Sequence, residues 1–231
     1  MFIGHFAVGF GTKEAAPQIK LGTLFFAAQF LDLIWPLLIL AGIEHVRINP
    51  NVIPFLRLQL YDYPISHNLL TSLIWSGLVG SAYYLINKTK RNAFIVGCAV
   101  FSHWLLDFIS HSPDLPLAPG LSTFVGLGLW NSTIATIIVE SALFLLGIFF
   151  YLRTTKAKDK IGVVALWMLI ILLGISYIAN IVGPPPPDAA PVGWMALSMW
   201  LFIPWGYWID RHRLNRISTS SEKENHHVPY S

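Results

Sequence analysis

Charged residues are scarce in this sequence. Asp, Glu, Lys and Arg make up only 12% of the 231 residues, where soluble domains carry about a quarter, and hydrophobic residues make up 55%. The composition therefore excludes an ordinary soluble domain and indicates an integral membrane protein. The net charge of +3 is small and its basic residues lie in short runs between apolar segments, so no nucleic-acid partner is expected.

Cysteine is almost absent as well. The single residue, Cys98, lies in an apolar run, which excludes an internal disulfide and a thiolate metal site, and we expect it to be a small buried packing residue. The first residues have no basic segment ahead of an apolar stretch and no small-residue cleavage site, so we expect no removable signal peptide. No internal repeat is evident, which disfavours the inverted-repeat architecture of many transporters.

Six apolar stretches approach the roughly 20 residues that are needed to cross a bilayer as a helix. They are residues 21–40, 69–86, 93–110, 130–152, 161–182 and 192–209. None of them alternates polar and apolar residues as the strands of a membrane barrel do. The sequence therefore predicts an all-α, polytopic membrane bundle of about six transmembrane helices within a single domain over residues 1–217, followed by a disordered polar tail at 218–231.

Lys and Arg are distributed unevenly among the loops, and this asymmetry sets the expected orientation. The segments that follow the second, fourth and sixth stretches are basic, whereas residues 111–129 and 183–191 contain no Lys or Arg. We therefore expect both chain termini to be cytoplasmic. The segment 41–68 would then face outward, although it carries two arginines.

Several ionisable side chains nevertheless lie within or beside the apolar stretches. A charged residue at the centre of a membrane helix costs roughly 2.5–3.5 kcal/mol to insert, so such residues are functional candidates by default. The candidates are Asp32, His103, Asp107 and Glu140 inside the stretches, His67 and His111 at their ends, and His5, which is flanked by apolar and small residues near the start of the chain.

The candidates on the third stretch follow a helical spacing. His103, Asp107 and His111 are four residues apart, so a helix would direct them to one side. Asp32 and His67 are expected at the same depth on neighbouring segments. Imidazole and carboxylate groups are ligands for Zn, Mn and Fe(II), and a set of them with an open position is typical of hydrolytic metal sites. We expect a divalent transition metal here, zinc first and Mn or Fe as alternatives.

A structural interpretation of the same residues stays open. Buried His and Asp side chains can hydrogen-bond one another or a neighbouring helix, and a membrane carboxylate can serve as a proton relay. Glu140 has no local partner of this kind, so packing or proton handling explains it as well as metal chemistry does.

The order of four short segments resembles one known family. "GHFAVG", an apolar helix with Asp32, "ISHNLL" and "SHWLLDFISHSPDLPL" follow one another as in the bacterial inner-membrane family of metal-dependent hydrolases, the YdjM-like group. The resemblance covers roughly the first half of the chain and implies a bacterial inner-membrane location. It also implies metal ligands at His5, Asp32, His67, His103 and Asp107. That family is distantly similar to zinc-dependent phospholipase C, which implies hydrolysis of a phosphodiester by metal-activated water.

The chain departs from the motifs of that family at four positions. Leu31 and Ile34 stand where a P-D-x-D element has its proline and second aspartate, and Asp62 and Tyr63 replace a His-Arg pair. A two-metal site is therefore less expected than a single ion, with His111 and Asp114 as candidate replacement ligands.

Geometry sets a condition on His5. If Lys13 and Lys20 are cytoplasmic, residues 1–11 as a helix cover only about 16 Å, too little to carry His5 into the outer half of the bilayer. His5 can then join the site only if the N-terminal segment re-enters the bundle and is buried in protein.

The leading hypothesis is a membrane-embedded metal-dependent hydrolase that acts on a lipid or lipid-linked phosphoester. Glu140 would be catalytic, as a general base or as the residue that orients a histidine N–H. Two alternatives stay open. One is a small proton- or cation-coupled transporter in which Asp32, Asp107 and Glu140 form a pathway, and the other is a non-catalytic membrane scaffold.

Overall fold

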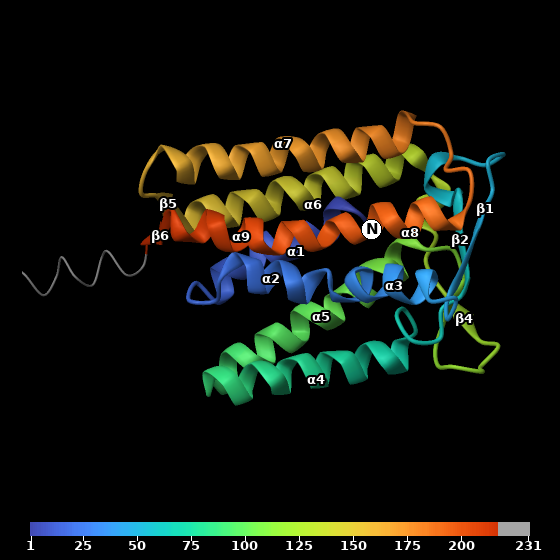
Figure 1. Cartoon of the computed structure of the whole chain (residues 1–231), viewed down its shortest axis with the longest axis horizontal. Coiled ribbons are helices and arrows are strands. Elements are labelled where there is room, and N and C mark those ends of the chain that lie inside the picture. Colours follow the sequence, from blue (N-terminus) through green and yellow to red (C-terminus); the bar gives the residue numbers. More distant parts are fainter. Residues whose placement is uncertain (217–231) are drawn as a thin grey trace, which may run out of the picture.

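Helices account for most of the structure, a computed structural model that describes residues 1–216 (Figure 1). The predicted tail at 218–231 lies outside the described residues. The α-helices are α1 (Ile3–Ala15), α2 (Leu21–Ala28), α3 (Phe30–Leu40), α4 (Leu69–Asn87), α5 (Lys90–Ser110), α6 (Thr133–Thr154), α7 (Lys160–Val182), α8 (Ala189–Leu197) and α9 (Phe202–Arg211).

Within the described residues the segments between helices form three two-stranded antiparallel sheets. β1 (His45–Ile48) pairs with β2 (Leu58–Asp62), β3 (Leu115–Pro116) with β4 (Phe124–Val125), and β5 (Thr155–Ala157) with β6 (Arg213–Asn215). Three 3-10 helices complete the fold, η1 (Pro54–Leu56), η2 (Leu129–Asn131) and η3 (Ser198–Leu201). The all-α prediction therefore holds for the bundle but not for the loops, whose backbone groups are partly paired in short two-stranded sheets.

Four helices are long and apolar enough to cross a membrane, namely α4, α5, α6 and α7. Helices α2 and α3 meet at a bend of 56° and would make a fifth span if counted together. The predicted sixth span, 192–209, is not one helix, because the chain passes from α8 through η3 into α9. Pro204 has no N–H to give to the carbonyl one turn earlier, which explains the break. The described residues thus form a membrane-type helical bundle with four or five spans rather than six.

The bend between α2 and α3 occurs at Gln29. Backbone hydrogen bonds continue around it, from Gln29 N to Phe25 O and from Leu33 N to Gln29 O, both at 2.9 Å. The Ala28 carbonyl beside the bend accepts a hydrogen bond from Nδ1 of His103 at 2.8 Å. The bend therefore supplies a backbone acceptor to a histidine of the predicted site.

Helix α1 is buried inside the bundle. His5, Phe6, Phe10 and Lys13 are each no more than 2% exposed. The helix packs against α6 at Gly147, where an added Cβ would lie only 2.4 Å from the carbonyl oxygen of Ala7. The N-terminal segment thus re-enters the bundle, which is the condition under which His5 can reach the site.

The loops rich in Lys and Arg lie at one end of the bundle, and the loops 111–129 and 183–191, which contain no Lys or Arg, lie at the other (Figure 1). At one end β5 pairs with β6, and Arg91 donates to the carbonyl of Ala15 at 2.7 Å. At the other end are the β1–β2 and β3–β4 hairpins, and there Arg57 donates to the carbonyl of Gly183, beside the proline run, at 2.7 Å. This separation agrees with the loop asymmetry in the sequence.

Helices α4 and α5 form a hairpin that is held by small residues. Gly97 allows a close approach, because an added Cβ would lie 3.1 Å from the carbonyl oxygen of Ser76, and Ser76 Oγ donates to Gly97 O at 2.7 Å. Cys98 is exposed, so the prediction that it is buried was wrong. The inward face of α5 is occupied instead by its neighbours Val96 and Val100.

Candidate metal centre

Two histidines and two aspartates from three separate segments meet inside the bundle. Nε2 of His67 lies 3.4 Å from Oδ1 of Asp32 and 3.7 Å from Oδ2 of Asp107. Nε2 of His103 lies 3.6 Å from Oδ1 of Asp32 and 3.3 Å from Oδ2 of Asp107. The four atoms close a ring in which each imidazole nitrogen faces both carboxylates. We call these four residues the His-Asp ring.

Local structure explains how each member reaches the ring. His103 and Asp107 lie one turn apart on the same face of α5. His67 directly precedes the N-cap of α4, Asn68, whose side chain accepts a hydrogen bond from Thr71 N at 2.9 Å. Asp32 stands in the first turn of α3, just after the bend. Two of the four ring positions, Asp32 and His67, therefore come from the bend or from a helix start, and a single face of α5 supplies the other two.

The hydrogen bonds on the far side of each imidazole assign its tautomer. Nδ1 of His103 faces the Ala28 carbonyl, which can only accept, so this nitrogen carries the proton. Nδ1 of His67 lies 2.6 Å from Oγ of Ser66. That hydroxyl donates its own proton to Oε2 of Glu44 at 2.6 Å, so it must accept from His67. In the neutral form of both histidines, the Nε2 lone pair points into the ring.

The ring therefore brings together four acceptors, which repel one another unless they share a cation or a proton. Nε2 of His103 is buried and has no hydrogen-bond partner, whereas buried polar atoms are normally paired. Ligand atoms bonded to a tetrahedral zinc at about 2.0–2.1 Å lie about 3.4 Å apart, close to the edges of the ring. The ligand atoms of Asp32, His67 and His103 all lie within 4.8 Å of one another. This set of residues fits a divalent transition metal.

His5 adjoins the ring on the side of Asp107. Its Nε2 lies 3.1 Å from Oδ1 of Asp107, and its imidazole stacks on His103 with the ring centroids 3.5 Å apart. The α-amino nitrogen of Met1 lies 2.6 Å from the same Asp107 oxygen. His5, His103 and Asp107 form a second group that could hold an ion, but it depends on the same Nε2 of His103. The two groups share one ligand nitrogen, so His103 can serve only one of them at a time, and the single metal stays a prediction.

The four ring side chains differ in exposure. The side chains of His67, His103 and Asp107 are between 0% and 4% exposed, whereas that of Asp32 is 24% exposed. Asp32, in the first turn of α3, is thus the ring member with a partly exposed side chain.

Glu140, a residue of α6, contacts the N-terminal end of α1. Its Oε2 accepts hydrogen bonds from Phe2 N at 3.0 Å and Gly4 N at 3.4 Å, and a carboxylate is stabilised at a helix N-terminus. Within the described residues no hydrogen bond or ion pair joins it to a histidine, so it does not orient one as predicted. It instead positions the helix that carries His5, and its role as a general base stays a prediction.

His111 is separated from the ring by the end of its helix. α5 ends at Ser110, and His111 is extended at φ −66° and ψ 148°, so the three residues of the four-residue spacing do not share a helical face. Its Nδ1 lies 3.0 Å from Oδ1 of Asp114, and its ring packs 4.3 Å from that of Trp130. His111 and Asp114 pair with each other, and neither belongs to the two possible ion-binding groups.

The sequence analysis missed Glu44. This carboxylate is 1% exposed and accepts hydrogen bonds from Ile65 N at 2.8 Å, Ser66 N at 2.7 Å and Ser66 Oγ at 2.6 Å. Glu44 lies outside every predicted span, so the cost of membrane insertion gave no reason to select it. The position of Ser66 directly before His67 was the one available signal.

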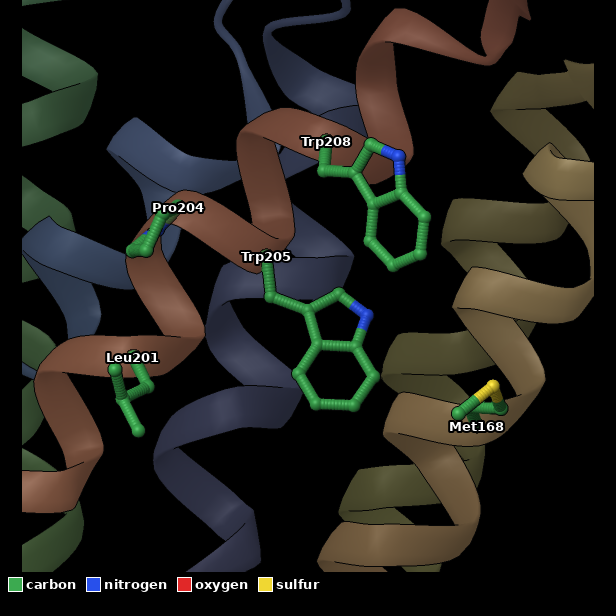
Figure 2. Close-up of a pocket in the computed structure, with 5 residues that line it drawn as sticks. All are labelled: Met168, Leu201, Pro204, Trp205 and Trp208. Carbon is green, nitrogen blue, oxygen red and sulfur yellow. The ribbon is translucent and has the colours of Figure 1, made fainter.

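An open groove lies away from the ring, between α7 and α9. Its volume is about 440 Å³, and it is lined by Met168, Leu201, Pro204, Trp205 and Trp208. Figure 2 shows the rings of Trp205 and Trp208 directed into the space between the two helices. Nε1 of Trp205 donates to the Ala165 carbonyl at 3.0 Å. The lining contains no ionisable group, so this groove offers apolar contact and no chemistry.

Comparisons of the chain with protein-family models, with curated proteins and with solved structures found no match. The resemblance to the YdjM-like group therefore stays an expectation from short motifs. The chemistry of the His-Asp ring is the main basis for a function.

Proposed function

We propose that this protein is a membrane-embedded metal-dependent hydrolase whose His-Asp ring holds one divalent transition metal. The observation that carries the proposal is the buried Nε2 of His103, which has no hydrogen-bond partner and faces two carboxylates. Zinc fits this mixture of imidazole and carboxylate best, and Mn or Fe(II) accepts the same ligands.

The residues in and around the ring would have different roles. His67, His103, Asp32 and Asp107 would hold the metal, which when bound supplies Lewis-acid activation of water and of a substrate oxygen. His5 turns Oδ1 of Asp107 toward itself and leaves Oδ2 for the ring. The partial exposure of Asp32 leaves one side for water and substrate.

The substrate class follows from the surroundings of the ring. The ring is built on α5 and on the bent pair of α2 and α3, both of which are candidate membrane spans. A lipid or lipid-linked phosphoester can reach a site at that depth, whereas a soluble polymer cannot. Membrane lipids are therefore the partners that we propose.

For the orientation we propose a bacterial inner membrane with the basic end of the bundle and both termini in the cytoplasm. The test uses single cysteines at Lys158 or Asp188 in a Cys98→Ser background and a membrane-impermeant thiol reagent applied to intact spheroplasts. Labelling at position 188 alone supports the orientation, and labelling at position 158 alone reverses it.

The first experiment on function is elemental analysis of the detergent-purified, tag-free protein. Wild type should carry about one equivalent of metal, and His103→Ala and Asp107→Asn should lose it. His45→Ala is the matched control, because His45 also contacts a carboxylate, Asp62, at 2.8 Å, but lies in an exposed pair. A folded wild type that stays metal-free after metal is added would refute the site.

The second experiment screens the metal-loaded protein against lipid and soluble phosphoesters. Hydrolysis that Asp107→Asn abolishes and His45→Ala retains would support the hydrolase. A protein that binds metal but cleaves none of these esters would refute the hydrolase while leaving the metal site in place.

The transporter alternative needs a continuous polar path through the bundle. Phe6 and Phe10, both fully buried, lie on α1 between His5 and Lys13 and pack against the ring of Phe25. This apolar packing and the clustering of two carboxylates in one ring favour the hydrolase. Metal-independent proton or cation flux in proteoliposomes would reverse that preference.

A further inference from the structure

We infer that Glu44 and Ser66 are positioning residues that fix the tautomer of His67 and thereby make its Nε2 a metal ligand. This inference rests on the proposed metal site. It assigns a role to two residues that do not belong to the ring and that lie in the loop region between α3 and α4.

Glu44, Ser66 and His67 form a continuous buried series of hydrogen bonds, which we call the Glu44–Ser66–His67 relay. Glu44 Oε2 lies 2.6 Å from Ser66 Oγ, and Ser66 Oγ lies 2.6 Å from Nδ1 of His67. Glu44, Ser66 and His67 are between 0% and 3% exposed, so water does not compete for these bonds. Hydrogen bonds to an ionised carboxylate are the stronger kind, which makes the chain stiff.

The direction of the hydrogen bonds follows from the acceptor at the end of the chain. An ionised carboxylate only accepts, so the single hydroxyl proton of Ser66 goes to Glu44. The oxygen of Ser66 is then left as an acceptor for the Nδ1 proton of His67. Nε2 is left unprotonated, 3.4 Å from Asp32 and 3.7 Å from Asp107.

The surrounding structure holds the segments at both ends of the relay. After α3 the chain turns through Gly42 at φ +68°, and Glu44 N bonds to the Leu38 carbonyl at 3.2 Å. On the other side, the Ile65 carbonyl accepts from Nε1 of Trp75 on α4 at 3.0 Å. The relay therefore connects the end of α3 with the start of α4, the two segments that supply Asp32 and His67.

Ligating histidines commonly donate their other nitrogen to a carboxylate or a backbone carbonyl, and losing that partner lowers metal affinity by about 10–100-fold. In this chain the two histidines of the ring use different partners. His103 uses the Ala28 carbonyl, which no side-chain substitution removes, whereas His67 depends on Ser66 and Glu44. Substitution can therefore address His67 alone.

The test compares Ser66→Ala and Glu44→Gln with Ser72→Ala as the matched control. Ser72 is also fully buried, but its hydroxyl donates to the Asn68 carbonyl at 2.7 Å and contacts no histidine. Competition with a zinc chelator should show affinity lowered about 10–100-fold in the first two variants and unchanged in the control. Ser66→Thr, which keeps the hydroxyl, should restore it.

Nitrogen-15 NMR of labelled histidine provides a readout that a packing role would not move. In metal-free wild type, at the alkaline end of a pH titration, neutral His67 should carry its proton on Nδ1. In Glu44→Gln the amide nitrogen should face Ser66 and donate to it, which leaves the hydroxyl to donate to His67. The proton of His67 should then move to Nε2.

The outcomes separate this inference from the proposed function. Nε2 protonated in the neutral His67 of wild type would overturn the relay, as would equal metal affinity in Ser66→Ala and Ser72→Ala. If Nδ1 carries the proton and responds to Glu44→Gln but the protein binds no metal, the relay sets the tautomer as inferred, while its role toward a metal and the proposed function both fail.

Discussion

Lys13 and Asp210 form an ion pair deep in the bundle, and its removal gives the sharpest stability prediction. Nζ of Lys13 lies 2.6 Å from Oδ2 of Asp210, and the side chains are 2% and 4% exposed. The same Asp210 oxygen accepts from Leu21 N at 2.7 Å, and Oδ1 accepts from the hydroxyl of Tyr151 at 2.8 Å. Lys13 also donates to the Ile19 carbonyl at 2.7 Å. The pair thus joins α1, α2, α6 and α9.

Removing one partner leaves the other charge buried, which destabilises by about 3–5 kcal/mol. We expect Asp210→Leu to lie at the upper end, because Lys13 keeps only the Ile19 carbonyl. Lys13→Met should lie at the lower end, because two donors still face Asp210. The double variant should be more stable than the sum of the single effects predicts, because no unpaired charge remains.

The assay is reversible unfolding in mixed detergent micelles, followed by circular dichroism as the denaturing detergent is increased. Arg153→Gln is the control, because Arg153 and Glu14 form a more exposed pair at 3.6 Å, which should contribute less than about 1 kcal/mol. Additive single effects, or a larger loss in Lys13→Met than in Asp210→Leu, would refute the assignment of the cost to an unpaired charge.

Two further predictions concern packing and pH. Gly147→Ala should destabilise the protein by about 1–3 kcal/mol in the same unfolding assay, because the new Cβ meets the backbone of Ala7. Gly174→Ala is the control and should not destabilise, because open space surrounds Gly174. The hydrogen bond from His212 lowers the pKa of Asp159 in the folded protein. The ionised Asp159 therefore stabilises the fold at every pH above the unfolded pKa of about 3.9. This stabilisation is lost as the pH falls through the lower, folded pKa. Thermal unfolding temperatures of wild type and Asp159→Asn should therefore differ at neutral pH and converge in acid, and a constant difference would contradict this reasoning.

The long helices could be predicted from the sequence because a helix that crosses a membrane needs about 20 apolar residues in a row, and hydropathy detects such runs. The apolar runs near 69–86, 93–110, 130–152 and 161–182 match α4 to α7 within a few residues. The runs at 21–40 and 192–209 were also predicted as single spans, but each is broken in the structure. Hydropathy measures length and composition, and it does not indicate where a bend or a proline interrupts a helix.

The four ring residues were predicted for a physical reason that the structure leaves intact. Asp32, His103 and Asp107 lie within apolar stretches, and His67 stands at the entrance of one, so each needs a polar partner in the bundle. The structure brings all four together. His111 was grouped with them by spacing alone, and spacing fails where the helix ends.

His5 and Glu44 show what the sequence could not supply. His5 reaches Asp107 only because α1 is buried in the bundle, a choice between two chain paths that depends on packing against α6 at Gly147. Glu44 meets Ser66 across the β1–β2 hairpin, at a separation of 22 residues. Such contacts depend on the tertiary fold, and a single sequence carries no periodic signal for them.

The two buried polar clusters of this bundle can be told apart by their hydrogen bonds. Around Asp210, a cation and two donors face a carboxylate, so that cluster is satisfied and its role is to hold four helices together. In the His-Asp ring, the far side of each imidazole is satisfied, while the near side presents acceptors to acceptors. The first cluster satisfies its buried polar groups within the chain, whereas the acceptors that face one another in the second need a shared proton or cation between them.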